Sequence, residues 1–154
     1  MINLSEIEFK DNRVYDILLT YLPALNYASL GKIKISSEYR DFVLDHTTLL
    51  HTPGSYWFYA TMGFMSEMGE VYDILTKSLR VGSTLDTGKL EEKLGDVLFY
   101  ITLRADSDAV MALIPGVPDF PKTEQEYIEA IRKLEQINMD KINKRKRETG
   151  NHLK

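Results

Sequence analysis

The chain has 154 residues, of which 44% are apolar and 27% are charged, and its formal net charge is −4. This length fits one domain with its own hydrophobic core, and the slight negative charge gives no general attraction to nucleic acid or to an anionic membrane. The lack of cysteine excludes disulfides, no apolar run is long enough to span a bilayer, and the first residues lack a signal-peptide core, so we expect a cytoplasmic protein.

The N-terminal third of the chain predicts helices with indistinct boundaries. Ser5-Glu6-Ile7-Glu8 has the form of a capping box, which favours the start of a short helix. Apolar residues recur at helical spacing from Val14 as far as Pro23, whereas residues 25–35 give no clear pattern. A further helix is expected next, with a serine N-cap followed by apolar and aromatic residues: Ser36 or Ser37, then Tyr39, Phe42, Val43 and Leu44.

The rest of the chain predicts three longer helices after a linker at residues 46–54. Gly82 favours a left-handed end to the first of them, and three prolines and a glycine exclude a helix from Ile114 to Pro121. A second capping box, Thr123 with Glu126, opens the last helix. The expected limits are Thr52-Pro53 or Ser55 to about Arg80, Asp86 or Thr87 to about Ser107, and Thr123 onward.

No segment shows the alternation typical of a β-strand, so the pattern predicts an all-α fold, an antiparallel helical bundle. We expect a single domain over residues 1–154. Within it we distinguish an N-terminal helical extension, residues 1–52, from a core motif region, residues 53–150.

Four acidic residues lie where the helices of a bundle normally carry apolar side chains. Glu67 and Glu70 fall within the apolar stripe of their helix, and Glu92 and Asp96 fall within that of the next helix. Two unpaired carboxylates at 4 Å repel each other by about 4 kcal/mol at an effective dielectric of 20, so their burial requires a compensating positive charge. All-oxygen ligation suits Mg²⁺, with Mn²⁺ possible, whereas solvation or pairing with lysines is the structural alternative.

Gly69 and Gly95 each precede one of these acids inside a helix. A glycine there costs about 1 kcal/mol relative to alanine. That cost is offset if two helices approach closely at the glycine, so both positions predict close packing, with or without a functional role.

Two segments around the acids resemble the motifs of a known enzyme family. Gly63–Val71, GFMSEMGEV, and Leu90–Tyr100, LEEKLGDVLFY, resemble the paired acidic motifs of the MazG-like nucleotide pyrophosphohydrolases, within the all-α NTP pyrophosphatase superfamily. Asn138–Arg145, NMDKINKR, is similar to the family's closing Asn-x-x-Lys-x-x-x-Arg element, and the resemblance covers about Tyr56 to Gly150. It implies an Mg²⁺-dependent enzyme that cleaves nucleoside triphosphates to a monophosphate and pyrophosphate.

The family pattern is Glu-Glu-x-x-Glu followed by Glu-x-x-Asp, and three of its acids are matched here by Glu67, Glu70 and Asp96. The resemblance implies that these three carboxylates bind Mg²⁺. We expect Glu67 also to act as the general base, because it is the first acid of the motif in this chain.

Two positions depart from the family pattern. Ser66 stands in place of the first glutamate, and Lys93 stands in place of the glutamate three residues before the aspartate. On the helical wheel Glu92 lies about 40° from Asp96 and Lys93 about 60° on the other side, so we expect Glu92 to complete the metal ligands. Lys93 is then expected outside the metal ligands or in contact with a phosphate.

Several side chains in and around the motifs are candidates for contact with the substrate. Substrate-binding candidates are basic, amide and aromatic side chains: Lys77, Lys93, Tyr100, Asn138, Lys141 and Arg145. The basic run that begins at Lys141 is also typical of a solvated helix C-terminus. Core packing is favoured over stacking on a base for most of the aromatic residues near the motifs: Trp57, Phe58, Phe99 and Tyr100.

We expect a nucleoside triphosphate as the substrate, no nucleic-acid or membrane partner, and a homodimer or homotetramer with sites near the interface. The alternative is a catalytically weakened protein of the same fold that acts as a nucleotide-binding or oligomeric interaction module. Ser66 and Lys93 are the residues that favour this alternative.

Overall fold

A computed structural model describes residues 6–9, 11–47, 53–80, 85–103 and 122–149 of the chain. These ranges contain five α-helices and no strand, which confirms the all-α bundle. No helix of the described ranges has the length and apolar character needed to cross a membrane. The helices are α1 (Arg13–Ser29), α2 (Ser37–Asp45), α3 (Pro53–Ser78), α4 (Thr87–Leu103) and α5 (Glu124–Thr149).

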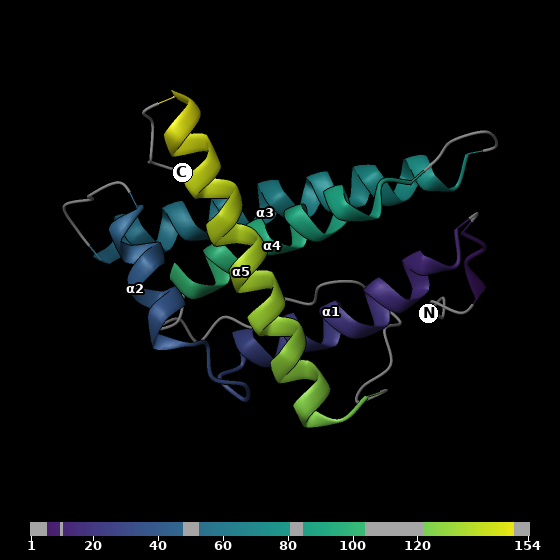
Figure 1. The fold of residues 1–154 in the computed structure, drawn as a ribbon, viewed down its shortest axis with the longest axis horizontal. Helices are drawn as coiled ribbons and strands as arrows, with labels where there is room; N and C mark the ends of the chain where they lie inside the picture. The colour runs from purple at the N-terminus through teal and green to yellow at the C-terminus, as the bar shows by residue number, and fades with distance from the viewer. Residues whose placement is uncertain (1–5, 10, 48–52, 81–84, 104–121, 150–154) are drawn as a thin grey trace.

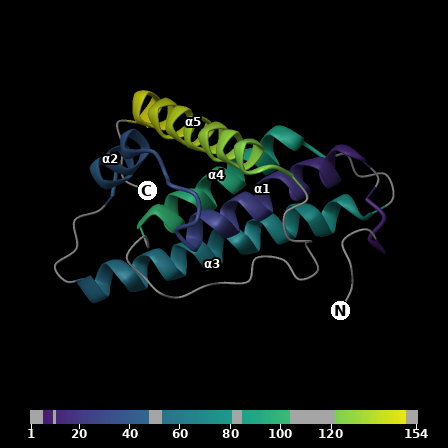
Figure 2. The ribbon, with the colours of Figure 1, turned by 90° about the horizontal axis from the view of Figure 1, so that it is seen from below.

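Helix α4 lies at the centre of the bundle. Among the described elements it contacts each of the other four helices, whereas α3 contacts α4 alone. Helices α3 and α4 form an antiparallel pair, and α5 crosses α4 on the side away from α3 (Figure 1). Figure 2 shows α5 and α3 on opposite sides of the molecule, with α1 and α4 between them. The second acidic motif therefore lies on the most enclosed helix, and the first lies on its outermost neighbour.

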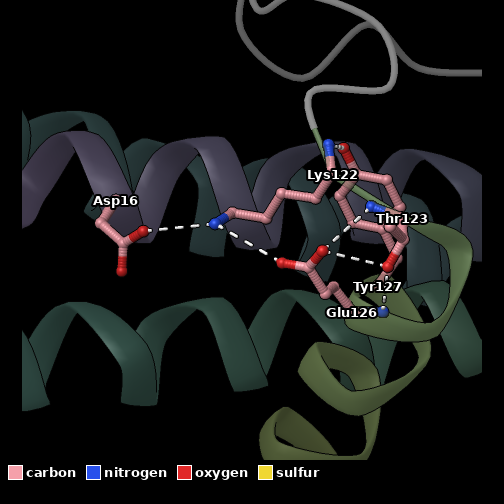
Figure 3. Close-up of polar contacts among 5 residues, drawn as sticks. All are labelled: Asp16, Lys122, Thr123, Glu126 and Tyr127. Carbon is pink, nitrogen blue, oxygen red and sulfur yellow. Dashed lines mark hydrogen bonds and ion pairs between the residues drawn. The ribbon is translucent and has the colours of Figure 1, made fainter.

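The predicted serine and threonine caps define the starts of α2 and α5. The Ser36 hydroxyl accepts a hydrogen bond from the Tyr39 N–H at 3.2 Å, as an N-cap does. At the start of α5, Thr123 Oγ1 accepts from the Glu126 N–H at 3.2 Å, and Glu126 Oε1 accepts from the Thr123 N–H at 3.3 Å (Figure 3). Lys122 then reaches Asp16 of α1 at 3.4 Å, which joins this helix start to the first helix.

The N-terminal segment differs from the prediction. Ser5 lies outside the described residues, and residues 7–9 are not helical. The Tyr15 hydroxyl accepts from the Phe9 N–H at 3.1 Å and donates to the Ile7 carbonyl, so tertiary contacts hold this segment in place of helical hydrogen bonds. The first helix begins only at Arg13.

Helix α1 also continues through Pro23, where the apolar pattern broke off. A proline in a helix interior costs about 3 kcal/mol, because it removes one hydrogen bond and its ring crowds the preceding turn. Leu22 and Leu25 on either side are buried, and burial of each is worth about 2 kcal/mol. Packing therefore outweighs the local cost, and the helix ends at Ser29, ahead of the left-handed Gly31.

One hydrophobic core unites the N-terminal helices with the rest. Helix α1 contacts both α4 and α5, so the segment predicted as an extension forms part of the bundle. The core is built from side chains of all five helices, and its fully enclosed members include Leu18, Leu22, Tyr39, Val71, Leu94, Leu98, Phe99, Tyr127, Ile131 and Leu134.

Close approach at a glycine occurs at two positions. A Cβ atom on Gly95 would lie 3.3 Å from the Asn138 Cβ, so α4 and α5 meet there as predicted. A Cβ atom on Gly63 would collide with the Tyr100 ring, so α3 and α4 meet at this second glycine. Nothing lies within 4 Å of a Cβ placed on Gly69, so the predicted close approach does not occur there among the described residues.

Candidate functional site

Asp96 is the buried centre of the candidate site, because it lies in the fully buried part of α4, residues 94–102. Only 1% of its surface is exposed. Its Oδ1 accepts a hydrogen bond from the Asn138 side-chain amide at 3.0 Å, and its Oδ2 accepts from Lys141 Nζ at 2.6 Å. The Tyr39 hydroxyl in turn donates to Asn138 Oδ1 at 2.8 Å. Helix α5 thus supplies both a charge and an amide that fix the orientation of this carboxylate.

Lys93 lies among the three acids that the family resemblance singled out. Its Nζ forms an ion pair with Glu70 Oε2 and lies 3.8 Å from Asp96 Oδ2 and 3.9 Å from Glu67 Oε2. The hydrogen bond from Lys93 lowers the pKa of Glu70. Burial opposes the charge on Lys93, but the hydrogen bond to Glu70 and the nearby Asp96 and Glu67 raise the pKa of this lysine.

Glu92 does not take the place that we expected. It is exposed, while Lys93 lies in the row of α4 that faces α3, together with Asp96 and Tyr100. The helical wheel places the two side chains on opposite sides of Asp96, and α3 packs on the side of Lys93. The exposed Glu92 therefore does not stand in for the missing family glutamate in this structure, and Lys93, which we expected outside the metal ligands or in contact with a phosphate, lies among the acids.

The charges of the site nearly balance without any added ion. Glu67, Glu70 and Asp96 contribute −3 and Lys93 and Lys141 contribute +2, which leaves −1. We call these five residues the acid cluster. Their burial is graded, because the Glu67 side chain is 14% exposed and that of Glu70 is 49% exposed.

The acid cluster fits a divalent cation in its chemistry but not in its present geometry. Three carboxylates around one positive centre are the hard oxygen ligands that Mg²⁺ prefers. The Lys93 ammonium, however, is that positive centre, and it takes the place between the three carboxylates that an Mg²⁺ ion would need. Consistent with this, no group of three or more Asp, Glu or His side chains among the described residues is arranged to hold a metal ion.

The predicted substrate-binding residues take different places in the structure. Asn138 is 0% exposed, and both it and Lys141 bind Asp96, so contact of either with a substrate stays a prediction. Lys77 pairs with Asp73 at 2.7 Å on the exposed side of α3. Arg145 is exposed one turn beyond Lys141 on α5.

The aromatic residues near the motifs divide between core and surface. Tyr100 packs edge-on against Tyr59 and Phe99, with ring centroids at 5.8 and 5.4 Å. Burial, with Tyr59 beside it, raises the pKa of the Tyr100 hydroxyl far above its ordinary range. Phe58 is exposed, and the Trp57 side chain lies outside the described residues. Core packing is confirmed for Phe99 and Tyr100 but not for Phe58.

Two residues of the site escaped the sequence reasoning. Tyr39 is wholly buried behind Asn138, and burial raises the pKa of its hydroxyl, so it remains a hydrogen-bond donor. No pattern in the sequence connects it to Asp96, since α2 and α4 are far apart along the chain. Gly63 carried the same signal as Gly69 and Gly95, a glycine inside a predicted helix, and the close approach occurs at Gly63 and Gly95 but not at Gly69.

The comparisons with known proteins give no further identification. No family model, no curated protein and no solved structure matches the chain. The resemblance to the MazG-like pyrophosphohydrolases therefore rests on the motif residues alone.

Proposed function

We propose that the protein is an Mg²⁺-dependent nucleoside triphosphate pyrophosphohydrolase, which converts an NTP or dNTP to a monophosphate and pyrophosphate. The observation that supports this proposal most directly is the convergence of Glu67, Glu70 and Asp96 from two helices upon one positive centre. The motif resemblance supplies the reaction class. A buried carboxylate held by an amide and an ammonium is costly to assemble, and such a cost is typical of functional sites.

Each residue of the acid cluster has a role in this proposal. Bound Mg²⁺ would neutralise the triphosphate and favour in-line attack of water on phosphorus, with Glu67, Glu70 and Asp96 as its ligands. Lys93 must leave the acids for this to happen, and the phosphate chain of the substrate offers its ammonium a new anionic partner. Lys141 and Asn138 keep Asp96 in place while Lys93 moves. Glu67, partly enclosed at the centre of the motif, is our choice as the general base.

Release of pyrophosphate from a panel of NTPs and dNTPs, with Mg²⁺ or Mn²⁺, tests the proposal. We expect turnover with at least one nucleotide and a loss of at least about a hundredfold in Glu70→Gln. Glu92→Gln is the matched control, because it makes the same chemical change on an exposed acid of α4. Turnover that persists in Glu70→Gln, or that is lost equally in both variants, contradicts this assignment of the site.

A second candidate function is favoured by the position of Lys93. An ammonium among the acids neutralises them without a metal, so the same residues also fit a nucleotide-binding or oligomeric interaction module with weakened catalysis. Nucleotide binding separates the two functions. Binding measured by calorimetry, combined with no turnover of any nucleotide in the panel, supports the module and rejects the enzyme.

A further inference from the structure

A pocket lies where the end of α3 meets the start of α4, and Figure 1 shows these two helix ends next to each other. It has a volume of about 530 Å³, and its lining includes Ile74 and Leu85, which pack against the hydrophobic core. We call it the turn pocket. Lys89 of its lining precedes Lys93 by four residues on α4, so the turn pocket lies about 6 Å along the helix axis from the acid cluster.

The lining of the turn pocket carries a net positive charge. Three basic side chains lie there with two acidic ones, so the charge is +1: Lys77, Arg80 and Lys89 with Asp73 and Asp86. Both acids already have partners within the chain. Asp73 pairs with Lys77 at 2.7 Å, and Asp86 Oδ1 accepts from the backbone N–H of Lys89 at 3.1 Å, as the cap of α4. The uncompensated positive charge of the pocket therefore comes from side chains.

Arg80 and Lys89 are the basic residues of the turn pocket that have no acidic partner. Both are exposed, one just beyond the end of α3 and the other in the first turn of α4, and neither forms an ion pair in the ranges that the structure describes. They act on the same space. The hydrogen bond from Lys77 lowers the pKa of Asp73, and the nearby charges of Arg80 and Lys89 lower it further. Two cations from two helices thus face one pocket in which an anion is the missing partner.

We propose that the turn pocket binds a phosphate chain, of which pyrophosphate is the shortest, through Arg80 and Lys89. A guanidinium donates two parallel hydrogen bonds to the oxygens of one phosphate, and an ammonium attracts the next phosphate as a point charge. A single carboxylate offers two oxygens and one charge, so it matches two separate cations less well. The volume of the turn pocket also lies within the range of about 300–1,000 Å³ that is typical of small-molecule sites.

Two sources supply this chemistry. One is free pyrophosphate, which requires nothing of the acid cluster, so the proposal does not depend on the hydrolysis proposed above. The other is the phosphate chain of a nucleotide whose reacting phosphate lies at the acid cluster. Because the turn pocket is one helical turn away, the outer phosphates of such a nucleotide extend toward Arg80 and Lys89.

Binding of inorganic pyrophosphate to the full chain in EDTA tests the turn pocket. By calorimetry we expect the wild type to bind it with a dissociation constant below about 5 mM, and we expect Arg80→Gln combined with Lys89→Gln to weaken binding at least about tenfold. Lys32→Gln combined with Arg40→Gln is the matched control, because it removes the same two kinds of charge from exposed positions elsewhere. Circular dichroism checks that both variants are folded. No binding by the wild type, or equal weakening in the two variants, overturns the proposal.

Backbone amide signals in NMR spectra locate the bound pyrophosphate. We expect the largest shifts in residues 77–80 and 85–89, and largest shifts around Lys141 and Arg145 would overturn the assignment to the turn pocket. Glu70→Gln, in which we expect turnover to be lost, should keep its affinity for pyrophosphate within about threefold of the wild type. Failure of the proposed hydrolysis and failure of the turn pocket are therefore separate results.

A nucleoside triphosphate with a methylene group between its α and β phosphorus atoms distinguishes the two sources. Its binding is measured in Mg²⁺ with the wild type and with the Arg80→Gln, Lys89→Gln protein. A loss of affinity equal to that for pyrophosphate supports the pocket as the place of the nucleotide's outer phosphates. An unchanged affinity for the nucleotide, with pyrophosphate binding lost, supports it as a site for free pyrophosphate.

Discussion

Replacement of Lys93 by glutamate tests whether this lysine neutralises the acid cluster. The substitution changes the net charge of the cluster from −1 to −3, since one positive charge becomes negative. At an effective dielectric of 20 and the 3.8 Å between Lys93 Nζ and Asp96 Oδ2, attraction of about 4 kcal/mol becomes repulsion of similar size. Because the new side chain can turn toward solvent and Glu70 is half-exposed, we expect a net loss of about 3–4 kcal/mol in the free energy of unfolding.

The same change should create a metal site that supports the fold. We expect Lys93→Glu to bind Mn²⁺ at least tenfold more tightly than the wild type, a gain of about 1.4 kcal/mol, as measured by calorimetry without nucleotide. Urea unfolding in chelator should show the loss of stability, and Mn²⁺ at about 100 times its dissociation constant should restore about 2.7 kcal/mol.

Lys89→Glu is the control for both measurements, because it makes the same charge change on an exposed residue one turn earlier in α4. We expect it to change neither metal affinity nor stability by more than about 0.5 kcal/mol. If Lys93→Glu behaves like Lys89→Glu in both assays, Lys93 is not the charge that holds the acids together, and the reasoning about the site is refuted.

Three further predictions concern the surroundings of the site. Asn138→Leu should lower the free energy of unfolding by about 2–4 kcal/mol in urea, because it removes the acceptor of the Tyr39 hydroxyl and the amide that donates to Asp96 Oδ1. Asn143→Leu, on the exposed side of α5, should change the free energy of unfolding little. Gly63→Ala should destabilise the protein by about 1–3 kcal/mol, because its methyl group meets the Tyr100 ring. Gly69→Ala should stabilise the protein by up to about 1 kcal/mol, because nothing lies within 4 Å of a Cβ placed there, and equal effects of the two variants would contradict the packing at Gly63. Burial and the hydrogen bond to Glu91 raise the pKa of Tyr21 to about 12. The stability that this shift contributes is therefore complete below pH 10 and is lost as the pH rises through 12. Tyrosinate absorbance should show this step in the wild type and not in Tyr21→Phe.

Local patterns in the sequence predicted the helix ends correctly where neighbouring residues in the sequence determine them. The caps at Ser36 and Thr123 and the limits of α3 followed from short-range chemistry, which a sequence displays directly. The start of α1 and its passage through Pro23 did not, because the contacts of Tyr15 and the burial of Leu22 and Leu25 come from tertiary packing. Propensity is a weak guide when the cost of a residue is offset by neighbours from other helices.

The sequence predicted which acids gather at the candidate site, but not which residue forms ion pairs with them. Motif spacing brought Glu67, Glu70 and Asp96 to one place, and the structure groups them. A wheel measured about Asp96 favoured Glu92 over Lys93, but the position of α3 decides which of the two faces the acids. The contribution of α5 to the orientation of Asp96 followed only in part, since the closing motif named Asn138 and Lys141 without indicating that they bind this carboxylate.

The unequal anchoring of α3 and α4 has a consequence for hydrogen exchange. Helix α4 contacts four neighbours, whereas α3 contacts only α4 among the described elements, so the amides of α4 should exchange more slowly than those of α3. Glu67 and Glu70 belong to α3, and Asp96 belongs to α4. A local opening that moves α3 away from α4 therefore separates the acids from one another, and binding of a ligand between them should slow exchange in α3 far more than in α4.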